Sequence, residues 1–331
     1  MALLLQSPLG IVLWGGLAAF LDYLVGDPPH WLHPVQVMGW FIDQLSRRIL
    51  QFCPYPWQRR LGGIALGGLL VLGSGGIGWL VLQVCDRYLP WLTPVLTIIL
   101  LASCLAGRSL SQATQSVLIP LQAGDLSQAR EKLSYFVGRD TAQLNEADIL
   151  RAILESWAEN SVDGVLAPWF YILLGCLFPV IGPVPLVLGY KAASTLDSMV
   201  GYLREPYRDL GWFSANLEDR LTWLPCRLTV LTLALLSGQP RTVLAICRRD
   251  APLDPSPNSG WSEAVYAAIL GVQLGGENTY QGETKWKPLL GNRDRPITPD
   301  VINQARQLTR LCFGVWFILA LMVAVSLQVK L

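Results

Sequence analysis

Charged side chains are scarce in this chain. Only 15% of its 331 residues are Asp, Glu, Lys or Arg, whereas 52% are hydrophobic, and the formal net charge is +1. The length alone would allow two soluble domains, but so little charge with so much apolar surface indicates a membrane protein. The composition also excludes a disordered chain, and the lack of a basic excess predicts no nucleic-acid partner.

Recognised metal and nucleotide motifs are also missing. Histidine occurs only twice, and the seven cysteines are scattered without a C-x-x-C pair, which indicates buried thiols rather than disulfides or a zinc site. The sequence contains no P-loop, no G-x-S-x-G and no H-E-x-x-H. It also lacks the internal repeat of inverted-repeat transporters.

Long apolar segments are abundant instead. Four of them have the roughly 20 residues that a helix needs to cross a bilayer core. The first has no basic leader and no A-x-A site, so we expect it to be kept as a membrane helix. We predict an all-α polytopic membrane bundle of four to six spans, forming a single domain over residues 1–331. The predicted spans are 6–25, 61–83, 89–107 and 311–329.

Two further apolar segments are irregular. Residues 165–190 hold four prolines and Gly182, enough to split a helix, so we expect a broken or re-entrant segment. Residues 221–238 contain Pro225 and Arg227, which leaves open whether they cross. The second span, 61–83, is rich in glycine, and in an apolar helix this predicts close helix packing rather than phosphate binding.

Lys and Arg are concentrated in three connecting segments. Residues 26–60, 108–164 and 238–310 hold four, five and nine of them. A four-span arrangement puts all three segments on one side, which the positive-inside rule assigns to the cytoplasm. We therefore predict a multi-pass protein of the cytoplasmic (inner) membrane, with the motif-bearing loops facing the cytoplasm.

The richest polar stretch begins at GRDT, residues 138–141. Thr141 or Asn145 can cap a helix running from about 146 to 160. On this helix Asp148, Arg151, Glu155 and Glu159 fall on one face, with Asn160 and Asp163 just beyond it.

Two interpretations of this face remain open. Carboxylates grouped on one face suit Mg²⁺ or a magnesium–nucleotide complex, since magnesium favours one or two carboxylates together with water and phosphate oxygens. The alternative is a solvated helix face with i,i+3 and i,i+4 ion pairs.

Other polar groups lie at the ends of apolar segments. His30 and His33, near Asp27, could serve a metal or a proton transfer, although a lone H-x-x-H is more often structural. Lys191 follows the Pro/Gly break, where an ammonium and a helix N-terminus together suit a phosphate, or where the lysine simply snorkels. The stretch from Ser259 to Glu263 predicts a helix start.

Six blocks in this order resemble one known family. They are GDPPHWLHPVQVMG, GRDT, ESWAENSVDGVLAPWF, YKAASTLDSMVGY, WFSANLEDRLTWLPCRLT and DAPLDPSPNSGWSEAVYAAILGVQLGG, which together span about residues 20–290. The chain is similar in these blocks to the CobD/CbiB family of cobalamin biosynthesis.

The resemblance implies an integral membrane adenosylcobinamide-phosphate synthase. Such a ligase joins the free propionate carboxylate of adenosylcobyric acid to the amine of (R)-1-aminopropan-2-ol O-2-phosphate, and activation by ATP and Mg²⁺ is the expectation for this step. The corrinoid, the aminoalcohol phosphate, the lipid bilayer and other late cobalamin-pathway membrane enzymes are the expected partners.

The resemblance also suggests roles for residues in the matching blocks. Glu155, Glu159 and Asp163 would hold Mg²⁺, Arg139, Lys191 and Arg249 would meet phosphates, and Asp140 or Glu263 would accept the ammonium proton. Asp27, His33, Asn160, Asp197, Asp219, Asn258 and Ser259 are further substrate-binding candidates. Two alternatives are a related non-catalytic membrane signalling protein and a corrinoid or small-anion permease.

Overall fold

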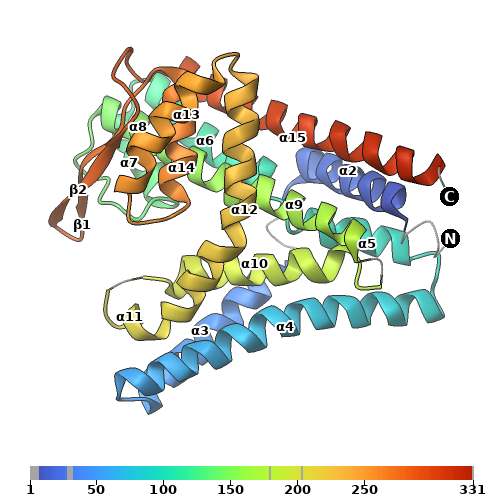
Figure 1. Cartoon of the computed structure of the whole chain (residues 1–331). Coiled ribbons are helices and arrows are strands. Elements are labelled where there is room, and N and C mark those ends of the chain that lie inside the picture. Colours follow the sequence, from blue (N-terminus) through green and yellow to red (C-terminus); the bar gives the residue numbers. More distant parts are fainter. Residues whose placement is uncertain (1–6, 28–32, 179, 203, 330–331) are drawn as a thin grey trace. The chain divides into compact units, whose positions relative to one another are not determined.

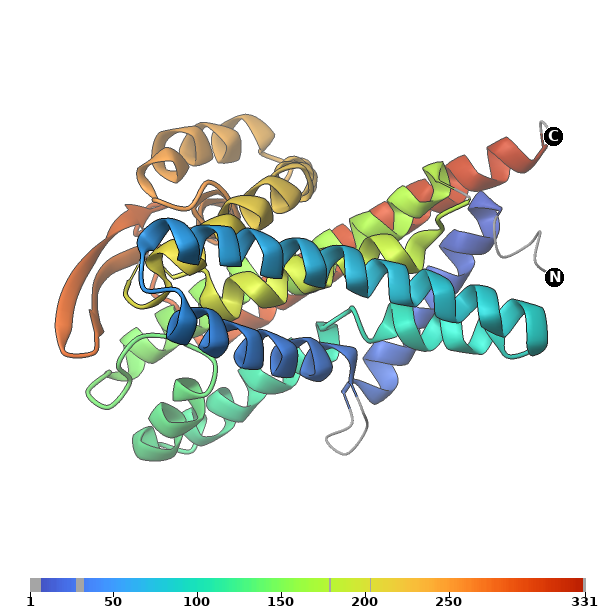
Figure 2. The same cartoon turned by 90° about the horizontal axis from the view of Figure 1, so that it is seen from below.

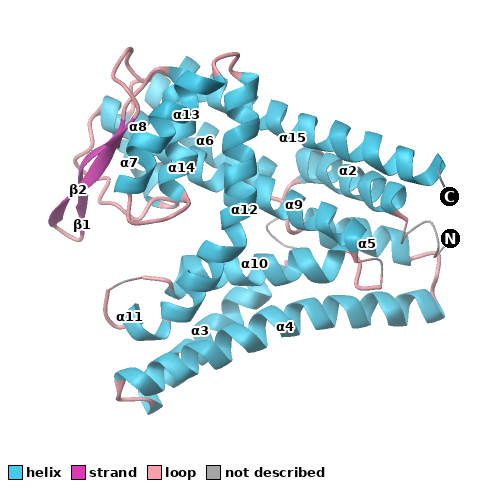
Figure 3. Cartoon of the chain, in the orientation of Figure 1, coloured by secondary structure: helices cyan, strands magenta, loops and turns pink. Residues whose placement is uncertain are grey.

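The structure is a computed structural model that describes residues 7–27, 33–178, 180–202 and 204–329. Helices make up most of this part of the chain, and its strands form one antiparallel hairpin (Figure 3). The elements are α2 Pro8–Val25, α3 Pro34–Phe52, α4 Pro56–Tyr88, α5 Thr93–Ala102, α6 Gly107–Gln122, α7 Leu126–Ser134, α8 Glu146–Ser161, the π-helical turn η1 Val162–Leu166, α9 Ala167–Leu174, the 3-10 turn η2 Gly175–Leu177, α10 Pro183–Val200, α11 Tyr207–Leu210, α12 Trp212–Leu236, α13 Pro240–Asp250, the 3-10 turn η3 Ala251–Leu253, α14 Ser259–Leu270, β1 Leu274–Tyr280, β2 Glu283–Leu290 and α15 Pro299–Val329.

Five helical runs are long and apolar enough to cross a membrane, so the protein is an all-α multi-pass membrane protein, as predicted. These runs are Pro8–Val25, Pro56–Tyr88, Thr93–Gln122, Glu146–Leu177 and Pro299–Gln328. Four of them contain most of the four predicted spans, with shifted ends. The predicted span 89–107 is interrupted, because α5 ends at Ala102 and α6 begins at Gly107.

The expected break within 165–190 is confirmed, but it lies after Pro168, between η2, which ends at Leu177, and α10, which begins at Pro183. Helical structure continues from α8 through η1 into α9 and η2, passing Pro168, and stops at Leu177. Pro168 has no backbone N–H to donate to the preceding turn, and the π-helical turn directly before α9 changes the hydrogen-bond pattern at this point. Pro183 and Pro185 lie in the first turn of α10, where backbone N–H groups have no helical partner anyway.

Contacts divide the chain into two compact units. The first unit comprises Met1–Arg108, Ala167–Leu221 and Trp316–Leu331, and the second comprises Ser109–Leu166 and Thr222–Val315. Whether these units act as the one domain expected from the sequence stays a prediction. Most of the doubtful segment 221–238 lies in α12, which passes through Pro225 as one helix, ends at Leu236 and is not among the five runs.

In the first unit, α10 packs along α4 (Figures 1 and 2). Glycines of α4 lie at this contact, because a Cβ added at Gly75 would come within 2.9 Å of the Pro185 carbonyl oxygen. A Cβ at Gly78 would meet Leu188 at 2.5 Å. The close packing predicted for this glycine-rich span is therefore confirmed.

A buried acid joins α2 to the start of α6 in the same unit. The Asp22 side chain is only 6% exposed, and its Oδ2 accepts hydrogen bonds from the backbone N–H groups of Gly107 (3.0 Å) and Arg108 (3.3 Å). These amides begin α6 and have no partner within that helix. The acid at the end of the apolar helix thus has a capping role.

In the second unit, α14 packs against α8, α13 and the hairpin. The Tyr266 hydroxyl of α14 lies 3.1 Å from the Ser161 hydroxyl of α8 and 2.6 Å from Thr309 of α15. The Trp157 indole donates to the same threonine at 2.9 Å. This buried polar network fixes α8 against α14, and with it the acidic face of α8.

Candidate active site

The hairpin supplies one wall of the candidate site. Its strands β1 and β2 are joined by Gln281 and Gly282, whose φ angles of 52° and 81° are those of a tight two-residue turn that matches strand twist. No strand was predicted here, since the alternation of polar and apolar residues in the segment is weak. Glycine takes one of the two positive-φ positions of this turn, where it is free of the strain that a side chain meets.

Asp140 binds this turn. Its carboxylate accepts hydrogen bonds from the backbone N–H groups of Gln281 (3.1 Å) and Gly282 (2.8 Å), and its own N–H donates to the Thr279 carbonyl at 2.8 Å. The carboxylate is therefore engaged in holding the hairpin. Of the two predicted proton acceptors, this arrangement favours Glu263.

A buried ion pair lies behind the hairpin. Arg139 donates from Nη2 to Glu155 Oε2 and from Nη1 to Asn278 Oδ1 at 2.8 Å. The other Glu155 oxygen accepts the Gly275 N–H at 2.8 Å. The side chains of the pair are only 8% and 2% exposed, so both charges are compensated inside the protein.

A second buried ion pair, between Glu263 and Lys287, joins α14 to β2. Glu263 is fully buried, and its Oε1 lies 2.5 Å from Lys287 Nζ. Its Oε2 is buried and has no hydrogen-bond partner among the described residues. The same ammonium is 3.8 Å from Asp254 Oδ2.

Burial dominates the protonation of Glu263. Loss of solvent raises the pKa of Glu263 to about 8, the nearby Glu155 and Glu159 carboxylates add to this rise, and Lys287 opposes it. For Lys287, burial lowers the pKa, but the surrounding carboxylates outweigh it and hold the pKa above its usual value.

Six of the charged side chains in this region, listed at the end of this paragraph, form what we call the charge cluster. Four carboxylates surround two cations, so the cluster has an acidic excess. Glu159, in electrostatic contact with Lys287 and Asp254, is exposed and marks where the cluster meets its surroundings. The members are Arg139, Glu155, Glu159, Asp254, Glu263 and Lys287.

The predicted three-carboxylate magnesium site is not assembled. Across the described residues, no three His, Cys, Asp or Glu side chains are grouped so as to hold a metal ion. Both oxygens of Glu155 are already bonded to Arg139 and to the Gly275 N–H. Asp163 lies in the π-helical turn η1, beyond the end of α8, so it does not continue the helical face that 155 and 159 share.

The start of α14 was predicted correctly at Ser259. The Ser259 hydroxyl donates to Asp254 Oδ1 at 3.2 Å, and this bond connects the helix start to the charge cluster. Asn258 precedes the helix, and its carbonyl accepts the Cys226 thiol at 3.4 Å. Asn160, at the end of α8, donates to the Ser156 carbonyl at 2.9 Å and is exposed.

Arg249 is bound by its neighbour. It donates to the two Asp250 oxygens at 2.5 and 2.8 Å and to Asn292 Oδ1 at 3.0 Å, while its side chain remains 56% exposed. Burial alone would raise the pKa of Asp250, but hydrogen bonds from Arg249 and from the Gly291 N–H, together with the Arg249 charge, lower it below its usual range.

Other predicted site residues belong to the first unit. His33 caps α3, accepting the Val35 N–H at 3.3 Å on Nδ1, and its Nε2 lies 3.1 Å from Asp27 Oδ1. This pairing is consistent with the structural interpretation of the H-x-x-H motif; His30 lies outside the described residues. Asp197 and Asp219 are on α10 and α12, and burial raises the pKa of Asp219.

We expected a helix N-terminus beside Lys191, and this prediction is wrong. Lys191 lies in the third turn of α10, eight residues after Pro183, or about 12 Å along the axis at the usual helical rise. Its half-buried side chain is instead in electrostatic contact with Asp22. A helix N-terminus and this ammonium therefore do not act on one phosphate.

Sequence reasoning missed three cluster contributors. Lys287 and Asn278 reach the cluster through the hairpin pairing, which was not predicted. Asp254 precedes α14 within the DAPLDPSPNSG block, so its position beside a helix start was the available signal.

Comparisons with known proteins identify the family. The family model described as CobD/Cbib protein matches residues 16–309, which include every predicted site residue. The chain is 56% identical over 320 residues to Cobalamin biosynthesis protein CobD of Synechocystis sp., covering 97% of this chain and 93% of that protein. No solved structure matches it.

Enterobacterial relatives agree. Cobalamin biosynthesis protein CbiB of Salmonella typhimurium is 42% identical over 296 residues, which cover 88% of this chain and 91% of that protein. Cobalamin biosynthesis protein CobD of Klebsiella pneumoniae is 43% identical over 296 residues, covering 88% and 90%. The chain belongs to the CobD/CbiB family.

Proposed function

We propose that the charge cluster is the active site of an adenosylcobinamide-phosphate synthase, the amide-forming ligase of cobalamin biosynthesis that membership of the CobD/CbiB family implies. The substrates would be adenosylcobyric acid, through its propionate carboxylate, and (R)-1-aminopropan-2-ol O-2-phosphate. The observation that carries this proposal is the buried Glu263 carboxylate, which keeps one oxygen without a partner beside Lys287.

Amide formation needs a base, because an ammonium group has no lone pair with which to attack a carbonyl carbon. A carboxylate with a pKa near 8 is well matched to this task, since a base is most effective when its pKa is close to the working pH. The acidic excess of the cluster would hold the ammonium. Lys287, bonded to Glu263 and 23% exposed, would hold the base in position with its ammonium group.

A carboxylate also needs activation before it reacts with an amine. When bound, ATP with Mg²⁺ would supply this by phosphorylating the propionate with release of ADP, and attack by the amine would then release phosphate as the amide forms. The described residues do not group three metal ligands, so we derive no step through a protein-held metal ion. The exposed guanidinium of Arg249 is the proposed contact for a phosphate, held in position by Asp250 and Asn292.

The proposal includes a location. We place the protein in the cytoplasmic membrane with its Lys- and Arg-rich segments in the cytoplasm, in agreement with the positive-inside rule. The bilayer would then collect the large amphipathic corrinoid near the site. Other membrane enzymes late in the same pathway are the proposed protein partners.

Reconstitution tests this function. The purified protein would be given adenosylcobyric acid, aminopropanol phosphate, ATP and Mg²⁺, and adenosylcobinamide phosphate would be followed by mass spectrometry. We expect Glu263→Gln, which preserves shape and still accepts from Lys287, to lower the rate by about 10²–10⁴-fold, the usual contribution of a general base.

Glu277→Gln is the matched control, since Glu277 is exposed on β1 of the same unit. The control should keep the wild-type rate. Product formation that is equal in both variants would remove Glu263 from the mechanism, and no product from folded wild-type protein would overturn the ligase assignment.

A further inference from the structure

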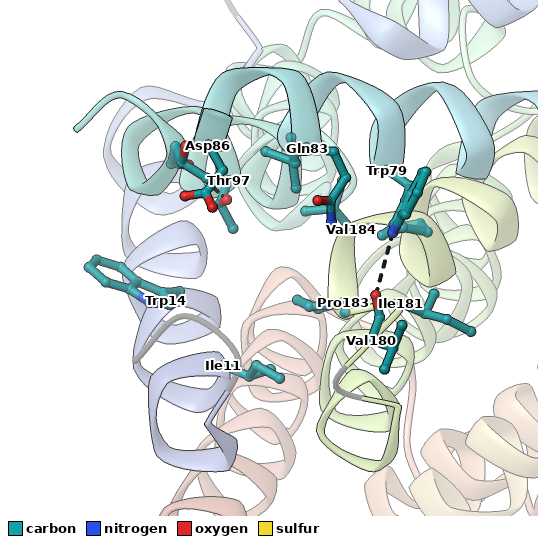
Figure 4. A pocket seen from close by; sticks show the side chains of 14 residues that line it. Ile11, Trp14, Trp79, Gln83, Asp86, Thr97, Val180, Ile181, Pro183 and Val184 are labelled. Carbon is teal, nitrogen blue, oxygen red and sulfur yellow. Dashed lines mark hydrogen bonds between the residues drawn. The ribbon is translucent and has the colours of Figure 1, made fainter. Parts of the chain in front are cut away.

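The first unit contains a pocket that the proposed reaction does not use. It has a volume of about 680 Å³ including its open mouth. Its walls come from the start of α2, the end of α4, the start of α5 and the turn that leads into α10 (Figure 4). Most of the lining is apolar, formed by Ile, Leu, Val and Pro side chains.

Several polar groups of the lining have no partner in the part of the chain that is described. Asp86 is half-buried and makes no hydrogen bond or ion pair there. Thr93 is only 5% exposed, and its hydroxyl is buried without a partner. The same holds for the indole nitrogen of Trp14. Burying such groups unpaired costs about 1–3 kcal/mol each, so a ligand that pairs with them would be favoured.

Charge and aromatic rings narrow the class of ligand. Among the described lining residues, Asp86 is the one ionisable side chain, so the pocket carries a negative charge and disfavours ligands with a net negative charge. The lining also contains two tryptophans, the residues that best attract a cation to the ring face. The Trp79 indole donates to the Val180 carbonyl at 3.4 Å, which fixes this ring against the turn before α10.

The position of the pocket indicates a ligand at the membrane surface. Gln83 and Asp86 lie in the last turns of α4, and Thr93 begins α5, so the pocket is at the ends of two membrane-crossing runs. Tryptophan is typical of this level of a membrane protein. An amphiphile would place its polar group on Asp86 and its apolar part against the walls.

We propose that this pocket binds an organic ammonium group, as carried by the headgroup of an ethanolamine phospholipid. The carboxylate of Asp86 pairs with the ammonium and the Thr93 hydroxyl accepts one of its N–H groups, while Trp14 and Trp79 line opposite sides of the pocket. The free counterpart of the same chemistry is a small amine such as ethanolamine. This site is independent of the charge cluster and of the proposed synthase reaction.

Lipid binding to the purified full-length protein tests the proposal. Dihexanoyl phosphatidylethanolamine and dihexanoyl phosphatidylglycerol, which have equal chains, would be titrated in detergent, and the bound lipid measured by native mass spectrometry. We expect the ethanolamine lipid to bind wild-type protein about tenfold or more tightly than the glycerol lipid. Binding of free ethanolamine as well would show that the ammonium alone suffices, whereas binding of the lipid only would identify the headgroup as the source.

Three variants sharpen the test. Asp86→Asn should abolish the preference for the ethanolamine lipid, and Arg87→Gln, at an exposed neighbour on the same turn, should retain it. Thr93→Val removes an unpaired buried hydroxyl, so it should keep the melting temperature while it weakens binding. Equal binding of both lipids to wild-type protein, or an unchanged preference in Asp86→Asn, would overturn the proposal.

Discussion

Replacing two glycines of α4 by alanine tests the packing of the first unit. A Cβ at Gly63 would lie 2.0 Å from the Leu210 carbonyl oxygen, whereas a Cβ at Gly68 would have no neighbour within 4 Å. The obstructing atom belongs to the backbone and cannot rotate away, so α4 and the α11 segment would have to separate by more than an ångström.

The expected magnitude follows from two opposing effects. Either substitution gains about 1 kcal/mol of helix propensity, and this gain cancels when the two variants are compared. Overpacking costs about 1–3 kcal/mol and more where backbone is obstructed. Gly63→Ala should therefore be less stable than Gly68→Ala by roughly 2–3 kcal/mol.

Thermal unfolding in one detergent, followed by tryptophan fluorescence, measures this difference. The midpoint of Gly63→Ala should fall below that of wild type, and the midpoint of Gly68→Ala should equal or exceed it. Two variants that melt together would refute the close approach of α4 and Leu210.

Three further substitutions probe the second unit. Arg139→Leu leaves the buried Glu155 without its cation and should cost about 3–5 kcal/mol, seen as a lower melting midpoint; an unchanged midpoint would mean that the pair is not buried as described. Asp140→Ala removes the acceptor of two turn amides, so hydrogen exchange at 281 and 282 should quicken, while equal exchange would contradict the contact. Asp250→Ala leaves the Gly291 N–H unpaired and should cost about 1–3 kcal/mol. Because the folded-state pKa of Asp250 lies below 3.8, its ionised form stabilises the fold above pH 3.8, and that part is lost as the pH falls through the folded-state pKa. Between pH 7 and pH 3, the melting midpoint of Asp250→Ala should therefore fall less steeply in acid than that of the wild type. The same dependence on pH in both proteins would contradict the assignment.

Local patterns predicted much of the helical structure. The Asn145 cap, the helix that begins at Glu146 and the helix that begins at Ser259 all depend on neighbouring residues, and each was predicted from the sequence. The apolar segments also indicated the membrane class. Their ends shifted because caps and prolines, rather than hydropathy, determine where α4 and α5 begin.

The features that the sequence did not predict depend on where a proline lies within a helix or on contacts between residues distant in the sequence. Pro168 was interpreted as a helix breaker, but the π-helical turn before it accommodates the proline. Arg139 and Glu155 are 16 residues apart and do not share a helix, so no helical periodicity predicts their ion pair. Lys287 approaches Glu263 only because β1 and β2 pair in the hairpin. The helical face that appeared to be a magnesium site is therefore largely committed to ion pairs with other elements.

The dependence of the rate of amide formation on pH tests the central claim most directly. With all substrates saturating, the wild-type rate should rise about tenfold per pH unit below pH 8 and level off above it, because Glu263 must lose its proton to act as the base. Glu263→Gln should be slow and lack this inflection, while Glu277→Gln should follow the wild type. A Glu263→Gln profile with the same rate and the same inflection would contradict the assignment of the charge cluster as the active site.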